Sequence, residues 1–324
     1  MQKKQISILA LQNANYASIV DARAVFKKVN ELYRERYKRD FFDIRIIGET
    51  KQVVIEDGLV TITPDTTTEN LDEKTDLIII PALRGDMISN SHHNRFFIDW
   101  IIRQYRKKAE VASLCTGAFM LAITGLLKNK KCTTHWNYAK EFRYYYPNVI
   151  LVDEKIIVEQ NGLYSSGGSN AYWNLLLFLV EKYVGREMAV LIAKHFVVNI
   201  DKMSQTPFII FNGLKEHEDE EILQAQEYIE KNYADKITIE NLCEKLFLTR
   251  RTFERRFKKA THCTVIEYLQ KVRVEASKKA LEAGRRSVDE IMLDVGYFDS
   301  QTFRQLFKKI TGLTPVEYRD KYKK

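Results

Sequence analysis

Two short stretches near the C-terminus, TFERRFKKAT (residues 252–261) and TFRQLFKKIT (residues 302–311), agree at six of ten positions and lie 50 residues apart. In each stretch two phenylalanines fall four residues apart, which is the spacing of the buried stripe on an amphipathic helix. Both stretches are followed by the pattern T-x-x-E-Y, again offset by 50 residues. Because the match extends in register beyond the basic helices themselves, it indicates a duplicated structural unit.

Residues suited to start a helix recur at matching positions in both copies. The candidate N-caps are Thr238, Thr249 and Thr264, then Ser287, Asp299 and Thr314. Their side chains can accept hydrogen bonds from free amides of the first turn, and T-x-x-E allows the reciprocal bond of a capping box. Pro315 suits the first helical position. Each set predicts a helix, a tight turn, a second helix and a third helix, so the helix-turn-helix pattern occurs twice.

The positions that differ between the copies lie on the face opposite the phenylalanines. They are Arg250, Arg251, Glu254 and Arg255 in the first copy and Ser300, Gln301, Arg304 and Gln305 in the second. Arginine, glutamine and glutamate are side chains that read guanine, adenine and cytosine edges in the major groove. A polar exposed face can also be merely solvated. A conserved interior with a changed outer face favours DNA reading, and Thr249 is included in the predicted base-contacting set.

Basic residues near these helices are predicted to contact phosphates, which position a protein on DNA without specifying sequence. They are Lys258, Lys259, Lys308, Lys309, Arg285 and Arg286. The helix expected between Thr264 and Gly284, a good C-terminal stop, has about 19 residues and a length of about 28 Å. It could hold two recognition helices about 34 Å apart, one turn of DNA, so that one chain reaches two successive major grooves.

The net charge is concentrated in the same region. Residues 222–324 hold 22 Lys and Arg against 15 Asp and Glu, a balance of +7, whereas residues 1–221 hold 29 against 28, a balance of +1. A basic domain is expected where a polyanion binds. Acidic protein surfaces also attract such domains, so a scaffold whose basic helices grip a protein is an alternative.

The N-terminal two thirds of the chain alternate between apolar strands and helices. Strands are expected at QISILAL (5–11), DIRIIG (43–48), DLIIIPA (76–82) and EVASL (110–114), with helices at 19–37 and 94–107. This alternation predicts a mostly parallel sheet covered on both faces. The acidic run NGLKEHEDEE (212–221) predicts a linker or exposed turn. The expected domains are therefore 1–205 and 222–324, joined by a linker at 206–221.

Several classes of protein are disfavoured by the sequence. The longest apolar run, LLLFLV (175–180), is too short to cross a bilayer. The four cysteines form no C-x-x-C pair and the histidines show no i, i+4 pairing, so neither a metal site nor a cofactor is expected. Free thiols, and a first strand where a secretory signal would lie, favour a cytoplasmic location.

Residues 220–322 resemble the DNA-binding domain of AraC/XylS-type transcriptional regulators. The resemblance rests on TIENLCEKLFLTRRTFERRFKKAT (238–261) and VDEIMLDVGYFDSQTFRQLFKKITGLTPVEYR (288–319), with its T-G-x-x-P-x-x-Y-R ending. It implies positions 250, 251, 254, 255, 300, 301, 304 and 305 as groove-facing, in agreement with the helical-face argument. His262 departs from the family, which usually has glycine there. Because histidine adopts left-handed backbone less readily, an altered turn is expected.

The N-terminal part resembles the PfpI-type, class I amidotransferase-like superfamily, which implies a flavodoxin-like α/β fold. The resemblance rests on VASLCTGAFMLAITGLL (111–127), CTTHW (132–136) and GLYSSGGSNAYWNLLLFLVEKYVG (162–185). Cys115 falls between a strand and a helix, where the helix N-terminus would expose the sulfur and favour its thiolate. His135 is a candidate partner. The pairing of this domain with an AraC-type module is GlxA-like.

Departures from the superfamily argue against catalysis. Thr116 follows Cys115 where peptidase-like members have histidine, and Ser18 stands about where members with a reactive thiol have glutamate, with Asp21 the nearest acid. The stretch PALRGD (81–86) replaces a Gly-Gly pair, which weakens an oxyanion site. We therefore expect no enzyme and a ligand pocket at Cys115, Thr116 and His135. A purely structural or dimerising domain, and a thiol-dependent hydrolase or glyoxalase-like enzyme using Cys115, are the alternatives.

Together these patterns predict a sequence-specific, DNA-binding transcriptional regulator. The expected partners are double-stranded DNA, a second copy of the chain, and a small effector, nitrogen-containing by the resemblance, but no membrane. RNA polymerase is a further partner if the protein is an activator. The sequence leaves the operator, the sign of regulation and the effector's identity open.

Overall fold

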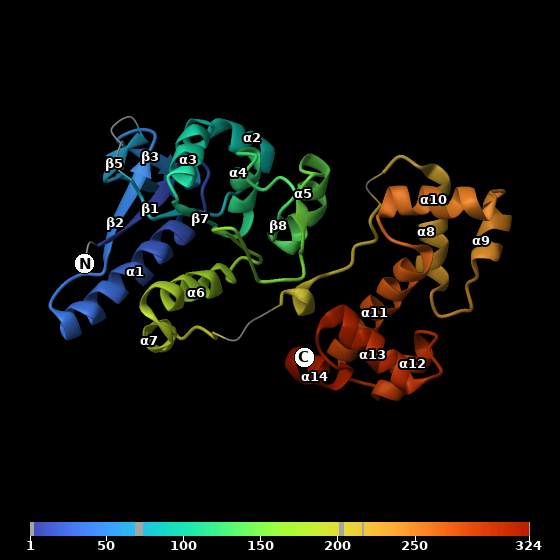
Figure 1. Cartoon of the computed structure of the whole chain (residues 1–324). Coiled ribbons are helices and arrows are strands. Elements are labelled where there is room, and N and C mark those ends of the chain that lie inside the picture. The colour runs from blue at the N-terminus through green and yellow to red at the C-terminus, as the bar shows by residue number, and fades with distance from the viewer. Residues whose placement is uncertain (1–2, 69–73, 201–203, 216, 324) are drawn as a thin grey trace. The chain divides into compact units, whose positions relative to one another are not determined.

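The computed structural model describes residues 3–68, 74–200, 204–215 and 217–323 of the chain (Figure 1). It divides into two compact units, Met1–Gln205 and Thr206–Lys324. The first unit has one hydrophobic core. The second unit has two cores, one for each copy of the repeat.

The first unit is built on a seven-stranded sheet with the strand order β10-β11-β7-β6-β1-β2-β5. The strands are β1 (Lys4–Ala10), β2 (Phe42–Gly48), β5 (Thr66–Thr67), β6 (Leu77–Ile80), β7 (Glu110–Ser113), β10 (Ile157–Gln160) and β11 (Leu163–Ser166). All neighbours pair in parallel except β10, which is antiparallel to β11. The order is that of a doubly wound, flavodoxin-like sheet, as predicted.

Helices cover both faces of this sheet because its central strands are apolar on both sides, as in β6, where all four residues are buried. One face carries α1 (Tyr16–Tyr37), α6 (Tyr172–Val184) and α7 (Arg186–Phe196) (Figure 1). The other carries α2 (Met87–His93), α3 (Phe96–Arg106) and α4 (Ala118–Ile123). Smaller elements are β3 (Val53–Ile55), β4 (Val60–Ile62), β8 (Lys131–Cys132), α5 (Ala139–Tyr145) and β9 (Ile150–Leu151).

The second unit is helical throughout its regular structure. Its helices are α8 (Glu220–Asn232), α9 (Ile239–Leu246), α10 (Arg250–Thr261), α11 (Val265–Ala283), α12 (Val288–Asp294), α13 (Ser300–Thr311) and α14 (Pro315–Tyr322). In Figure 1, α8, α9 and α10 lie together at one end of α11, and α12, α13 and α14 lie at the other. Two helix-turn-helix halves are thus joined by one long helix.

The helix boundaries of the second unit are fixed by short-range capping. All six predicted N-caps are N-caps in the structure, and each side chain accepts a hydrogen bond from a backbone amide of the first turn. Thr264, Ser287 and Thr314 complete capping boxes with the glutamate three residues later. Gly284 ends α11 in left-handed conformation, with φ of 67°. These caps were predictable because each depends only on residues within one turn.

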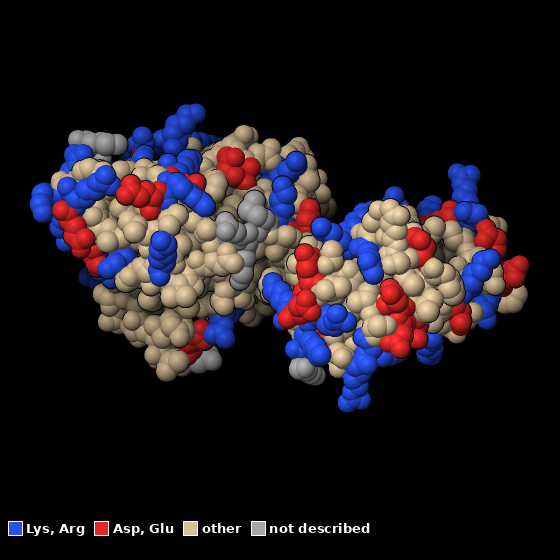
Figure 2. Space-filling model, turned by 90° about the horizontal axis from the view of Figure 1, so that it is seen from below, with Lys and Arg blue, Asp and Glu red and all other residues tan. Residues whose placement is uncertain are grey.

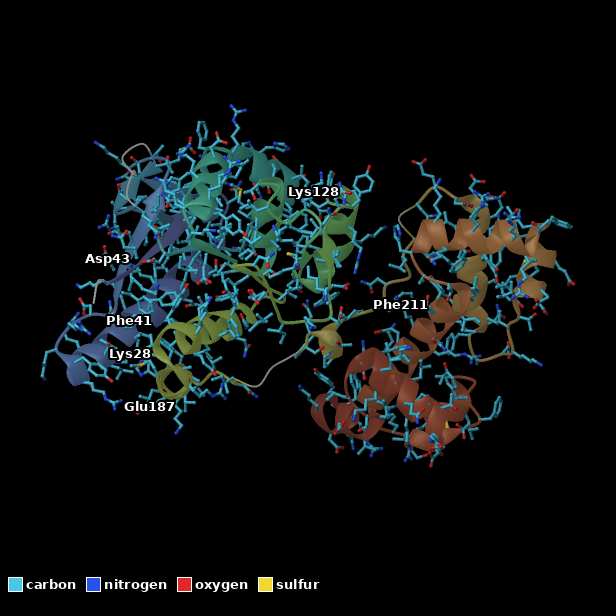
Figure 3. The ribbon with its side chains drawn as sticks, in the orientation of Figure 1. Lys28, Phe41, Asp43, Lys128, Glu187 and Phe211 are labelled. Atoms are coloured by element: carbon cyan, nitrogen blue, oxygen red, sulfur yellow. The ribbon has the colours of Figure 1, made fainter. Side chains whose placement is uncertain are left out.

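The segment before α8, expected to be a linker, is docked onto the second unit. The Phe211 ring, labelled in Figure 3, lies 5.2 Å from the ring of Tyr268 on α11. Lys278 Nζ donates to the carbonyl of Ile209 at 2.7 Å. Gln226 Nε2 donates to the carbonyl of Gly213 at 2.8 Å. Residues 209–214 are therefore held by buried side chains of α8 and α11.

Candidate nucleic-acid interface

The second helix of the first half, α10, presents its predicted reading face to solvent. Phe253 and Phe257 are buried in the first core of the unit. Thr249 caps the helix, accepting from the amide of Thr252. The predicted groove-facing side chains Arg250, Arg251, Glu254 and Arg255 are all exposed, as are Lys258 and Lys259. Burial of one stripe therefore leaves the opposite stripe free for a ligand.

The second helix of the other half, α13, has the same arrangement. Phe303 and Phe307 are buried in the second core. Gln301, Arg304, Gln305, Lys308 and Lys309 are exposed, and Ser300 is half-buried. The two helices are thus built alike on the inside and differ on the outside.

Some of the exposed cations already have partners. Arg250 contacts Glu240 at 2.8 Å and Glu254 at 3.2 Å. Arg304 lies 3.7 Å from Asp289, and Arg286 pairs with Asp294. Arg251 and Arg255, in contrast, form no ion pair with any residue that the structure describes. To bind a polyanion, Arg250 and Arg286 would have to give up these ion pairs. Among the described residues, Arg251 and Arg255 would have no ion pair to break.

An open groove runs beside α10. It has a volume of about 740 Å³ and joins the exposed face of α10 to the starts of α9 and α11. Its lining consists of Ile239, Arg250, Arg251, Glu254, Arg255, Lys258, Thr264, Val265 and Ile266. Five of the residues predicted to contact DNA therefore share one concave surface.

The turn after α10 keeps its geometry despite His262. His262 adopts the left-handed conformation with φ of 56°, and Gly312 occupies the equivalent place after α13 with φ of 77°. Each residue's amide donates to the carbonyl of Lys258 or Lys308, respectively. The expectation of an altered turn was wrong. The local hydrogen bonds hold histidine in a conformation that glycine adopts more easily.

One cation of α10, Arg256, was missed as a structural residue. Its guanidinium group donates to both carboxylate oxygens of Asp219, at 2.9 and 2.6 Å, and to Glu221 at 2.6 Å. This pairing lowers the pKa of Asp219 and that of Glu221. The acidic run read as a linker thus anchors α10 to the start of α8. The two carboxylates that bind Arg256 lie 35 and 37 residues before it in the chain, so a local sequence pattern could not reveal the pairing.

On one face of the second unit, positive and negative side chains are intermingled. Figure 2 shows Lys and Arg side chains interspersed with Asp and Glu over the visible face of this unit. The face seen in this view therefore carries no uniform basic patch.

The second candidate site, around Cys115, lies where β7 ends. Cys115 has φ of 52° and opens a short 3-10 helix, Cys115–Gly117, that leads into α4. Gly117 is required there, because a Cβ atom would lie 2.4 Å from the carbonyl oxygen of Pro81. Cys115 is only 4% exposed, and burial raises the pKa of its thiol to about 12. The predicted exposed thiolate is therefore wrong, because apolar burial outweighs the helix terminus.

The residues that the sequence associates with Cys115 form hydrogen bonds within the fold. Thr116 Oγ1 donates to the carbonyl of Leu83 at 2.7 Å and accepts from its amide at 2.8 Å. Ser18, at the place expected for glutamate, donates to the carbonyl of Asn15 at 2.7 Å and accepts from the amide of Ala82 at 3.1 Å. Asp21 accepts from Tyr172 at 2.6 Å. The bonds of Thr116 and Ser18 tie the Cys115 turn and α1 to the segment after β6, and the bond of Asp21 joins α1 to α6.

His135 lies on a neighbouring segment. Its Nδ1 accepts from the amide of Asn137 at 3.1 Å, and burial lowers the pKa of the imidazole. The preceding residue, Thr134, donates to the carbonyl of Cys115 at 3.2 Å, so this segment contacts the Cys115 turn through Thr134. Gln205, which sequence reasoning missed, donates to the carbonyl of Thr134 at 2.9 Å. The residues that the structure describes include no cluster of three or more metal-ligating side chains.

Comparison with known proteins gives matches for both units. A family model described as a helix-turn-helix domain matches residues 242–321, and a model described as the DJ-1/PfpI family matches residues 22–182. Within the described residues, no helix has the length and apolar character needed to cross a membrane.

Relatives match along most or part of the chain. The HTH-type transcriptional regulator GbdR of Pseudomonas aeruginosa is 27% identical over 299 residues, which cover 91% of this chain and 78% of GbdR. The HTH-type transcriptional regulator CdhR of the same species is 24% identical, with 62% and 60% covered. Isonitrile hydratase of Pseudomonas putida is 30% identical, with 36% and 49% covered.

Solved structures share the fold of part of the chain. Drosophila melanogaster DJ-1beta has a TM-score of 0.52 at 19% identity, covering 61% of this chain and all of that one. An AraC family transcriptional regulator from Pseudomonas putida has a TM-score of 0.50 at 17% identity, covering 60% and 99%. At these identities the likeness concerns the fold alone.

The two units and their matches define a DJ-1/PfpI-type α/β domain followed by a duplicated helix-turn-helix domain. The chain thus combines these two types of domain, and it is similar over most of its length to the HTH-type transcriptional regulator GbdR.

Proposed function

We propose that the protein regulates transcription by placing α10 and α13 in two successive major-groove segments of one DNA duplex. One observation carries this proposal. Both helices begin at a side-chain N-cap and bury two phenylalanines, yet their exposed faces differ at every predicted groove-facing position. Two copies of one scaffold with different outer faces suit the reading of two different base sequences.

The proposed roles of the side chains follow from their chemistry. Base edges would be contacted by Thr249, Arg250, Arg251, Glu254, Arg255, Ser300, Gln301, Arg304 and Gln305. Phosphates would be contacted by Lys258, Lys259, Lys308 and Lys309, which lie in the last turns of the two helices. The 19 residues of α11 span about 28 Å, which suits two helices one DNA turn apart.

A binding titration at several salt concentrations tests DNA recognition. Each phosphate neutralised by the protein contributes a slope of about 0.9 to the fall of log affinity with log salt. We expect Lys308→Gln with Lys309→Gln to weaken binding to all duplexes and to lower this slope. Arg255→Ala should instead relax the preference at particular base pairs. A salt-independent affinity, or equal affinity for all duplexes, would contradict sequence-specific binding.

For the first unit we propose a sensing and pairing role. Relatives such as GbdR and CdhR are named as transcriptional regulators, which supports control of DNA binding by this unit. A small effector near Cys115, Thr116 and His135 would act by binding one arrangement of the protein more tightly than another. We further propose a homodimer, a cytoplasmic location and, for an activator, contact with RNA polymerase.

Catalysis at Cys115 is the second candidate function. It is favoured by the positive φ of Cys115, because strained backbone is frequent at reactive sites. The burial of the thiol and its raised pKa oppose it. We propose that the protein acts without turnover at this residue. Cys115→Ser should therefore keep DNA binding, and a hydrolase or glyoxalase-like activity that vanished in this variant would show the proposal to be wrong.

A further inference from the structure

The two helix-turn-helix halves are connected by more than the α11 helix. Arg273, in the middle of α11, directs its guanidinium group to main-chain carbonyls of both halves. It donates to Tyr233 at 2.7 Å and to Asp235 at 2.9 Å, in the loop between α8 and α9. It also donates to Gly296 at 3.1 Å, in the turn between α12 and α13. One side chain therefore binds the first half to the second.

The main chains of the two halves also touch at this point. Gly296 has φ of 80°, and a Cβ atom there would lie 2.4 Å from the carbonyl oxygen of Ala234. The ring of Tyr233 packs against both hydrophobic cores. Arg273 thus lies at a junction where the main chains of the two halves are in contact. A small displacement of one half toward the other would cause a steric clash there.

The junction continues to the second recognition helix. The guanidinium of Arg273 lies 5.0 Å from the ring centre of Tyr297, within cation–π range. The ring of Tyr297 lies 5.6 Å from that of Phe303, a buried residue of α13. A change at Arg273 can therefore reach the position of α13 through two contacts.

Arginine is suited to this role because its charge is permanent and its donors are held in a rigid planar fork. Three of its donors are used on carbonyl oxygens, which makes these hydrogen bonds charge-assisted. We infer that Arg273 is a positioning residue that fixes the distance and rotation between α10 and α13. It thereby sets the spacing of the two DNA segments that one chain accepts. This inference rests on the proposed two-groove binding.

The consequence for DNA is a strict spacing. One inserted base pair moves the second groove segment by about 3.4 Å along the duplex and by about 34° around it. A reader whose halves are fixed cannot follow this change without losing contacts. A reader whose halves move on α11 can follow it in part.

The test uses the full-length chain and duplexes that it selects from a random pool. Single base pairs are then inserted between the two protected segments of a selected duplex. For the unmodified chain we expect each insertion to lower affinity at least about tenfold, the loss caused by misplaced base contacts. For Arg273→Met we expect weaker binding to the selected duplex and a spacing penalty below about threefold, because base contacts are then partly retained.

A charge-matched control separates spacing from charge. Lys279 is exposed on the same helix, and Lys279→Met removes one positive charge without touching the junction. This variant should keep the full spacing penalty. If no duplex is selected, two-groove binding itself fails. If duplexes are selected but Arg273→Met keeps the unmodified chain's penalty, the role assigned to Arg273 is overturned.

A second measurement covers the case in which Arg273→Met does not fold. Arg273→Lys keeps the charge and the aliphatic stem but lacks the planar fork. Spin labels at Lys259→Cys and Lys309→Cys lie at exposed positions of α10 and α13, and the native cysteines are buried. We expect Arg273→Lys to broaden the distance distribution between the labels. An unchanged distribution with an unchanged spacing penalty would contradict the inference.

Discussion

At the scale of single residues, the two copies place different residues at an equivalent position of left-handed backbone. His262 and Gly312 end equivalent helices in left-handed conformation, with φ of 56° and 77°. Glycine adopts this region freely, whereas other residues do so at a cost of roughly 1–2 kcal/mol. The first copy therefore carries a local strain that the second copy lacks.

Exchanging these residues tests that difference. The nearest atoms to a Cβ at Gly312 lie 3.8 Å away, so a side chain fits and only the backbone is strained. We expect Gly312→His to lower the free energy of unfolding by about 1 kcal/mol, because the steric cost of roughly 1–2 kcal/mol is partly offset by the smaller entropy that histidine loses on folding. His262→Gly should raise it by a similar amount, because both contributions are then reversed. Chemical denaturation followed by circular dichroism measures both. Two exchanges that changed the free energy of unfolding in the same direction would contradict a difference in local strain.

Residues whose partners are close in sequence were predictable, whereas residues with distant partners were not. The six N-caps were predictable because each accepts a hydrogen bond from the amide three residues later. Arg256 and Arg273 were not recognised, because their partners lie between 23 and 40 residues distant and are in part main-chain carbonyls. Cys115 was placed correctly at a strand–helix turn, but its burial depends on packing that no local pattern specifies.

At the scale of elements, α10 and α13 are separable into a shared interior and a specific exterior. Both bury two phenylalanines and a threonine whose hydroxyl donates to the carbonyl four residues earlier. The exposed residues contribute little to these cores. The folding of each helix and its proposed base preference are therefore set by different side chains.

This separation predicts that a reading face can be transplanted. In a chain carrying Arg250→Ser, Arg251→Gln, Glu254→Arg and Arg255→Gln, α10 receives the outer residues of α13. We expect the unfolding free energy to change by no more than about 0.5 kcal/mol per site, as is usual for surface positions. The duplexes selected by this chain should contain the same base pattern in both segments. Unchanged selected sequences would show that these side chains do not read bases.

At the scale of the whole molecule, the two units have separate cores and separate spectroscopic signals. The three tryptophans, Trp100, Trp136 and Trp173, all lie in the first unit. The helices of the second unit contain no tryptophan but contribute strongly to the helical circular dichroism signal. Tryptophan fluorescence therefore follows the first unit alone, while circular dichroism follows both.

Ligand binding should then stabilise the units selectively. A ligand present at 100 times its Kd stabilises the folded state that binds it by about 2.7 kcal/mol. We expect a selected DNA duplex to raise the unfolding temperature seen by circular dichroism, while the tryptophan transition stays in place. The shift should shrink as salt is added, because phosphate contacts are lost. A duplex that raised the tryptophan transition by the same amount would show that the first unit shares the DNA-binding energy, and the assignment of recognition to α10 and α13 alone would then be incomplete.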